Sequence, residues 1–244
     1  MELRGSIRVQ GVPPADAGVQ ERLCAYQNTR NASFAGFLAD KGLLITTRFA
    51  DSAQVHHVRE PMGMRKQITF FKEPVKGCLP CPRGASAVAD VGFIYGADVG
   101  GDEQLQFSFF DLKSGKSKRF TDGTSKHLGP CWAADGSAIA FSSNERDGTH
   151  FDVYTLSFSD LRGEQESINR QKRLVMQNAD PGYYWTTGAV KNKDGSTTLL
   201  VHHYISVSNS QLFLVEAPGG ARTKIAVKAL LPRPSRFKPL PLMH

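Results

Sequence analysis

The stretch Cys131-Trp-Ala-Ala-Asp-Gly-Ser-Ala-Ile-Ala-Phe-Ser-Ser-Asn-Glu-Arg-Asp-Gly-Thr-His-Phe-Asp-Val-Tyr154 decides the fold of this chain. It contains two Asp-Gly pairs, at 135–136 and 147–148, and this dipeptide suits the positive-φ positions of a tight hairpin turn. Between the pairs, Ile139 and Phe141 alternate with small residues, as the buried positions of a half-buried strand do. The stretch therefore predicts strand, turn, strand, turn and strand, which is most of a four-stranded antiparallel sheet.

Similar units occur on both sides of this stretch. Turn sequences near residues 41, 90, 135 and 194 lie about 45 to 60 residues apart, which is the length of one blade of a β-propeller. We therefore predict an all-β fold, a partial β-propeller of about four four-stranded blades with a short N-terminal helix. The strands are expected at 33–38, 43–49, 54–58 and 66–71; at Ser86–Val88, 92–97, 105–112 and 118–121; at 128–132, 138–143, 152–158 and 173–176; and at 184–190, 197–203, 211–215 and 223–227.

The N-terminal and C-terminal segments differ from this pattern. Residues 14–29 predict a helix, because Val19, Leu23 and Tyr26 follow helical spacing, and we expect it to lie as a lid or strap against the domain that follows. Four prolines after Leu230 oppose regular strand pairing. The expected organisation is a helical segment at 1–30, propeller blades forming an incomplete ring at 31–228, and a Pro-rich basic tail at 229–244.

Charge and hydropathy argue against two classes of partner. The 244 residues include 30 Lys and Arg against 23 Asp and Glu, but six of these bases lie in residues 217–244, which hold no acid, so residues 1–216 carry 24 bases and 23 acids. A nearly neutral body does not predict a nucleic-acid-binding face. No apolar run approaches the roughly 20 residues that span a bilayer, and no secretory signal is visible at the N-terminus. We expect a cytoplasmic protein with neither nucleic-acid nor membrane partners.

Four cysteines, Cys24, Cys78, Cys81 and Cys131, raise the question of metal binding. Only one close pair is present, Cys78-Leu-Pro-Cys81, whereas a structural zinc site needs four ligands and normally a second pair. Free thiols in a reducing compartment are the favoured interpretation, and half of a zinc site is the alternative.

Other candidate ligands also fit structural roles. His56-His57 and His202-His203 are adjacent within predicted strands, so the two imidazoles of each pair point to opposite faces and do not converge on one ion. The segment at 100–103, Gly-Gly-Asp-Glu, lacks the alternating acids of a calcium loop and the Lys of a phosphate loop. The sequence therefore predicts no metal site and no cofactor.

The decisive stretch resembles the TolB-like propeller repeat. That repeat has the pattern Trp-Ser-Pro-Asp-Gly, a strand, an Arg-Asp-Gly-type turn and then Asp-Ile-Tyr. The residues of this chain that match it are Trp132, Asp135, Gly136, Ile139, Ala140, Phe141, Ser142, Ser143, Arg146, Asp147, Gly148, Asp152 and Tyr154, whereas Ala134 stands at the position of the proline.

A second resemblance involves Tyr26–Phe34, Leu44–His56 and Arg65–Phe71, which are similar to the first blade of bacterial prolyl oligopeptidase-family serine peptidases. The likeness extends over roughly residues 12–228. It implies the N-terminal propeller of such an enzyme, which caps an α/β-hydrolase domain and filters peptide substrates by size. The partners it implies are a peptide substrate and that hydrolase domain.

The catalytic signature of that family is absent from the sequence. A hydrolase domain would carry Gly-X-Ser-X-Gly at a strand-to-helix turn, and no such motif occurs in residues 1–244. We therefore expect no catalytic residue and no enzymatic activity from this chain alone. Two alternatives remain open, a stand-alone TolB-like propeller that binds another protein and a gene fragment without function.

Arg30, Arg48 and Asp51 are the candidate functional residues. They lie in the segment that resembles the first blade, whose loops would face the central channel. They predict an ion pair at the channel rim or between domains. The alternative is an ordinary salt bridge between blades, which contributes only about 0–1 kcal/mol when exposed.

Overall fold

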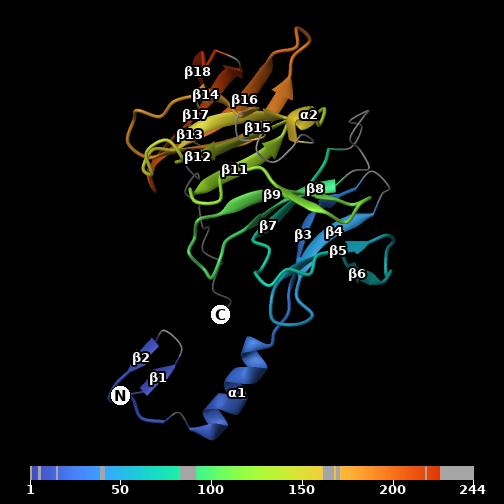
Figure 1. The fold of residues 1–244 in the computed structure, drawn as a ribbon, viewed down its shortest axis with the longest axis vertical. Coiled ribbons are helices and arrows are strands. Elements are labelled where there is room, and N and C mark those ends of the chain that lie inside the picture. Colours follow the sequence, from blue (N-terminus) through green and yellow to red (C-terminus); the bar gives the residue numbers. More distant parts are fainter. Residues whose placement is uncertain are drawn as a thin grey trace, which may run out of the picture.

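Four antiparallel four-stranded sheets make up most of the chain in this computed structural model, which describes residues 2–4, 7–14, 16–38, 42–82, 92–161, 168, 171–217 and 219–225. The sheets follow one another in an open arc, with the first and the fourth at its two ends (Figure 1). This arrangement confirms the predicted all-β fold, a partial β-propeller with a short N-terminal helix. The predicted tail at 229–244 lies outside the described residues.

Each sheet is a meander in which strand order follows the sequence. The first sheet contains β3 (Ala32–Phe37), β4 (Leu43–Thr47), β5 (Gln54–Val58) and β6 (Arg65–Gln67). The second contains β7 (Gly77–Pro80), β8 (Gly92–Ala97), β9 (Gln106–Asp111) and β10 (Ser117–Arg119). The third contains β11 (His127–Trp132), β12 (Ala138–Ser143), β13 (Asp152–Ser157) and β14 (Arg173–Met176), with the short helix α2 (Phe158–Leu161) after β13. The fourth contains β15 (Tyr183–Lys191), β16 (Thr197–Ser206), β17 (Asn209–Ala217) and β18 (Arg222–Ile225).

One strand lies away from its expected position. The segment Ser86–Val88, expected to open the second sheet, is outside the described residues, and β7 is the first strand of that sheet instead. Prolines around β7 obscure it in the sequence, because proline cannot donate to a strand ladder. β7 is an edge strand, and Pro80 is its last residue, paired with Phe93, so the missing N–H is tolerated there.

Three apolar clusters fill the space between consecutive sheets. Leu44 and Val55 of the first sheet pack with Phe93 of the second. Ile139 and Phe141 of the third sheet face the second, as their alternation predicts, whereas their neighbours Ala140 and Val153 belong to the cluster shared with the fourth sheet. Because every inner sheet is buried on both faces, each blade depends on the next for its core.

A buried polar contact recurs at the start of the third strand of the first three sheets. The first residue of that strand is Gln54, Gln106 or Asp152, and it binds the segment that follows the fourth strand. In the first sheet the Thr69 hydroxyl donates to Gln54 Oε1 at 2.9 Å, and in the second the Thr121 hydroxyl donates to Gln106 Oε1 at 2.7 Å. These Gln–Thr pairs fix the exit of the fourth strand against the third.

The Gln–Thr pair of the second sheet gives a stability prediction. The Thr121 side chain is buried, and its hydroxyl accepts the N–H of Phe107 at 3.0 Å. Thr121→Val therefore removes a partner from the Phe107 N–H and from Gln106 Oε1. We expect the free energy of unfolding to fall by about 1–3 kcal/mol, measured by chemical denaturation. Thr149→Val, at an exposed position, is the control and should change stability by less than about 0.5 kcal/mol. Equal effects of the two substitutions would contradict the prediction.

The predicted N-terminal helix is present as α1 (Ala17–Gln27). The prediction that it lies as a lid or strap against the following domain is wrong. Asp16 caps it by accepting the N–H of Val19 at 3.1 Å. No residue of the helix is buried, and Leu23 is 46% exposed. The helix points away from the sheets (Figure 1). A hairpin of β1 (Glu2–Arg4) and β2 (Ile7–Val9) precedes the helix and also lies away from the sheets.

Val19, Leu23 and Tyr26 form an apolar stripe on α1, and no sheet of the described residues covers it. Arg22 and Gln27 lie beside the stripe on the helix surface. Among the helices of the described residues, none has the length and apolar character required to cross a membrane.

Candidate functional site

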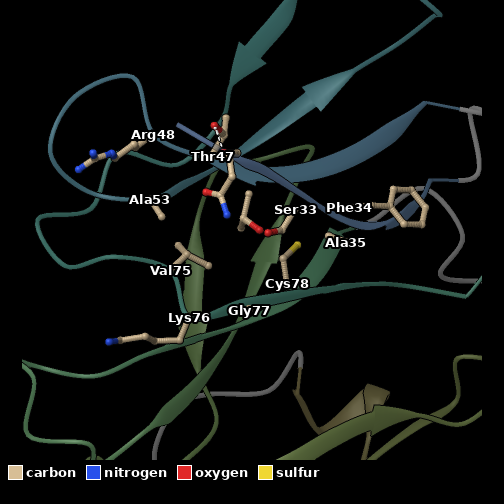
Figure 2. Close-up of a pocket in the computed structure, with 12 residues that line it drawn as sticks. Ser33, Phe34, Ala35, Thr47, Arg48, Ala53, Val75, Lys76, Gly77 and Cys78 are labelled. Carbon is tan, nitrogen blue, oxygen red and sulfur yellow. Dashed lines mark hydrogen bonds between the residues drawn. The ribbon is translucent and has the colours of Figure 1, made fainter. Parts of the chain in front are cut away.

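A cavity of about 400 Å³ lies between the first two sheets, where β3 meets β7. These are the first strands of their sheets. Figure 2 shows Arg48 and Lys76 on one side of the cavity, with Cys78 pointing toward Ser33. The lining residues are Asn31, Ser33, Phe34, Ala35, Thr46, Thr47, Arg48, Ala53, Val75, Lys76, Gly77 and Cys78.

Arg48 connects this cavity to the N-terminal helix. Its Nη2 donates to the main-chain carbonyls of Gln27 and Thr29, the second at 3.2 Å. The final carbonyls of a helix have no partner within the helix, so a guanidinium there satisfies them and complements the negative end of the helix dipole. The Thr47 hydroxyl also donates to the Asn31 carbonyl at 2.7 Å. The end of β4 therefore fixes the segment that leads from α1 into β3.

The structure does not bring the three candidate residues together as an ion pair. Arg30 and Asp51 are exposed, and neither forms a salt bridge with any of the residues that the structure describes. Arg48 lines the cavity and binds carbonyl oxygens in place of a carboxylate. A role of these residues at a channel rim or between domains stays a prediction.

The cavity is lined by polar, apolar and positively charged side chains. Burial raises the pKa of the Cys78 thiol far above its usual range, so this sulfur is protonated near neutral pH. The residues that line the cavity, all of them described, include no histidine, aspartate or glutamate. Lys76 lies at the rim, with its Nζ 3.6 Å from Asp98 Oδ2.

A second polar cluster lies between the second and third sheets. His127, the first residue of β11, has a fully buried side chain whose Nε2 lies 3.7 Å from Asp122 Oδ1 and 3.9 Å from Glu145 Oε2. Asp122 follows β10, and Glu145 follows β12. Within the described residues, this is the one group of three or more His, Cys, Asp or Glu side chains arranged closely enough to hold a metal ion.

Both carboxylates of this cluster are ionised. Burial opposes ionisation of Asp122, but hydrogen bonds from Ser125 and Thr124 outweigh it and lower the pKa of Asp122 to about 2. Burial likewise opposes ionisation of Glu145, whereas the contacts with His127 and Lys172 lower its pKa overall. The cluster therefore presents two negative charges to the imidazole.

Sequence reasoning missed this cluster because it considered only adjacent histidines. Asp122 and Glu145 lie 5 and 18 residues from His127, which matches no ligand-spacing pattern. The adjacent pairs alternate between faces as predicted, since His202 contacts Trp185 whereas His203 stacks on Tyr184 with ring centroids 4.1 Å apart. In the sequence, His127 is only a single histidine just before the predicted strand at 128–132, and its burial appears only in the structure.

The lowered pKa of Asp122 predicts acid sensitivity. Its folded pKa of about 2 lies below the ordinary 3.8, so Asp122 contributes stability above about pH 4 that is lost as the pH falls through 2. At pH 6 the denaturation midpoint of wild type should be higher than that of Asp122→Asn. The difference between the two midpoints should shrink as the pH is lowered to 2. Asp102→Asn, in an exposed loop, is the control. A gap that is constant across this range would contradict the assignment.

Neither a family model nor a curated protein sequence matches this chain. Three similar solved structures are TolB from Acinetobacter baumannii, a prolyl endopeptidase and an oligogalacturonate lyase from Vibrio parahaemolyticus. Their identities to this chain are 18%, 9% and 11%, with TM-scores of 0.53, 0.59 and 0.55. The alignments cover 80%, 84% and 80% of this chain, and 43%, 31% and 52% of those chains.

These comparisons establish the fold alone, because every identity is low. The three similar structures are β-propeller proteins, and the chain spans between about a third and half of the length of each. The likeness is therefore to a portion of each of those proteins.

Proposed function

We propose that this chain is a non-catalytic propeller portion of a prolyl oligopeptidase-like serine peptidase, and that it gates or selects peptide substrates for an α/β-hydrolase domain. The prolyl endopeptidase likeness, at a TM-score of 0.59 over 84% of this chain, supports the architecture. The missing Gly-X-Ser-X-Gly motif supports the absence of peptidase chemistry in residues 1–244.

The observation that carries the proposal is the unsupported state of α1. An isolated helix of 11 residues is only marginally stable in water, and none of the described residues covers its apolar stripe. Val19, Leu23 and Tyr26, exposed by 40%, 46% and 74%, form that stripe, and Arg48 fixes the end of the helix beside the cavity. A second domain packed on the stripe would be coupled directly to the site that selects the substrate.

The cavity suits a short segment of extended peptide. A volume of about 400 Å³ admits one or two side chains and excludes a folded domain. Arg48 and Lys76 line one side of it, but Arg48 is bound to main-chain carbonyls and Lys76 lies near Asp98. Val75 and Cys78 supply apolar contact. The volume and the lining of the cavity therefore favour selection of the peptide by size.

The two ends of the arc also require cover. Phe34 and Phe37 on β3 are 61% and 51% exposed, with ring centroids 5.1 Å apart, and Val190 and Leu214 on the fourth sheet are 56% and 40% exposed. Apolar faces of this kind mark interaction surfaces.

We assign the protein to the cytoplasm as part of the same proposal, because its four cysteines are free thiols.

Affinity capture tests the proposal. The full chain used as bait should retain a protein that carries a Gly-X-Ser-X-Gly hydrolase domain, identified by mass spectrometry. Leu23→Asp should reduce its recovery at least tenfold, because a carboxylate would then be buried in the contact. Ala25→Asp, which places the same charge on the opposite side of the helix, is the matched control and should leave the recovery unchanged.

Two results would contradict the proposal. A specific partner without a hydrolase domain would favour the alternative of a stand-alone TolB-like interaction module. Turnover of a prolyl chromogenic peptide by the purified chain, proportional to its concentration and retained through several purification steps, would contradict the non-catalytic assignment.

A further inference from the structure

We infer that His127, Asp122 and Glu145 form a binding site for a divalent transition-metal ion between the second and third sheets. One imidazole nitrogen and two carboxylate oxygens from these residues lie within 4.8 Å of one another. The site differs from the substrate-selecting cavity and does not depend on the proposed function.

The tautomer of His127 points to a ligand. Its Nδ1 lies 3.0 Å from the carbonyl oxygen of Leu105, so the hydrogen on Nδ1 is donated to that oxygen. A neutral imidazole then carries a lone pair on Nε2. The Nε2 is buried without a hydrogen-bond partner and faces the two carboxylates. A backbone carbonyl on the other ring nitrogen is also the usual support of a metal-binding histidine.

The separations fit a shared ion better than a shared proton. Hydrogen bonds from nitrogen to oxygen measure about 2.7–3.2 Å, and the Nε2 distances here are 3.7 Å to Asp122 and 3.9 Å to Glu145. Ligands bound about 2.1 Å from one tetrahedral ion lie roughly 3.4 Å apart. Each of these two separations would therefore shorten by a few tenths of an ångström when the three side chains bind one ion.

Asp122 is held in place before any ion binds. Its Oδ1 accepts the N–H groups of Thr124 and Ser125, both at 3.0 Å, and its Oδ2 accepts the Ser125 hydroxyl at 2.5 Å. The Gln–Thr pair of the second sheet fixes the same loop, because Gln106 Nε2 donates to the carbonyl of Ser125 at 2.6 Å. Such outer contacts orient a ligand and lower the entropy lost on binding.

Lys172 opposes the ion. Its Nζ lies 2.5 Å from Glu145 Oε2 and its side chain is only 6% exposed, so an ion must share or displace this ammonium. The affinity is therefore set by competition between the ion and Lys172. One nitrogen with two carboxylate oxygens suits zinc, cobalt or manganese, whereas calcium and magnesium prefer all-oxygen sites.

Cobalt and zinc titrations of the metal-free full chain test the inference. We expect one equivalent of Co²⁺ to give visible absorption bands that Zn²⁺ abolishes by displacing the cobalt. At a Zn²⁺ concentration about one hundred times the dissociation constant, the unfolding midpoint should rise by roughly 5–10 °C. Asp122→Asn and Glu145→Gln should each weaken binding at least about tenfold, since each removes a charged ligand.

Two further variants separate the site from nonspecific binding. Lys172→Gln should tighten binding by roughly fivefold, because it removes a competing positive charge near the ion. His150→Ala is the matched control. His150 also pairs with an aspartate, Asp147, at 2.8 Å, but its side chain is 42% exposed and lies outside the cluster. The variant should bind the metal with the affinity of wild type. Circular dichroism of the metal-free forms checks that each variant folds.

The inference is overturned if wild type binds neither ion beyond the level of Asp122→Asn. It is also overturned if Asp122→Asn and Glu145→Gln, both folded, bind with the affinity of wild type, or if His150→Ala alone loses binding. In the first case, the three side chains would form a structural contact between the sheets with no metal involved.

Discussion

Phe141→Ala should lower the free energy of unfolding by about 3–5 kcal/mol. The Phe141 side chain is fully buried at the centre of the cluster between the second and third sheets. Its ring packs edge-on against Phe120 at 5.6 Å and stacks on Tyr154 at 6.0 Å, measured between centroids. The truncation removes apolar contact and leaves a cavity between two blades that hold each other in place.

Urea denaturation followed by tryptophan fluorescence measures this effect, since Trp132 belongs to the same cluster. Phe70→Ala, at a side chain that is 78% exposed, is the matched control and should change stability by less than about 0.5 kcal/mol. Phe141→Leu should cost less than Phe141→Ala, because it keeps most of the volume. A loss below about 1 kcal/mol for Phe141→Ala would mean that the two sheets unfold independently of this contact.

The strands and their grouping into sheets were largely predictable because their determinants are local. The Asp-Gly pairs mark hairpin turns, and Gly136, Gly148 and Gly195 have φ angles of 70°, 76° and 87°, which side chains with a Cβ rarely adopt. Alternation of Ile139 and Phe141 with small residues also fixed which face is buried. Such signals lie within a few residues of the structure they specify.

Elements that depend on distant contacts were less visible. β7 forms in a segment bounded by prolines because β8 offers it an edge, and neither feature follows from local propensity. The helix α1 was predictable from spacing, but its packing was not, because no sequence pattern states whether a partner surface exists. The same limit applies to Arg48, whose partners are main-chain carbonyls that any residue can supply.

The candidate metal site illustrates this limit most directly. Asp122 belongs to the connection after the second sheet, whereas His127 and Glu145 belong to the third. The Gln106–Thr121 contact that orders the loop spans 15 residues. Only the folded register brings these groups to one point, so residue types and spacing could not have identified them.

The match to the TolB-like repeat has a physical explanation in the contacts of Asp152. Its side chain is fully buried, and Arg146 binds it through Nε to Oδ2 at 2.6 Å and through Nη2 to Oδ1 at 3.1 Å. Asp152 Oδ1 also accepts the N–H of Asn178 at 2.8 Å. The Arg of the Arg-Asp-Gly turn and the Asp of the Asp-Val-Tyr strand therefore form one unit that joins the second, third and fourth strands of the blade.

Asp152→Ala should accordingly lower the free energy of unfolding by about 3 kcal/mol, because it leaves the guanidinium and the N–H of Asn178 without their buried acceptor. Asp152→Asn keeps an acceptor for that N–H and should cost less, and Asp102→Ala, in an exposed turn, is the control. In the double variant with Arg146→Ala the two losses should not add, since both substitutions break the same contact. Strict additivity, or an effect of Asp152→Ala no larger than that of Asp102→Ala, would mean that this motif specifies the turn alone and that the blade is held together by its apolar faces.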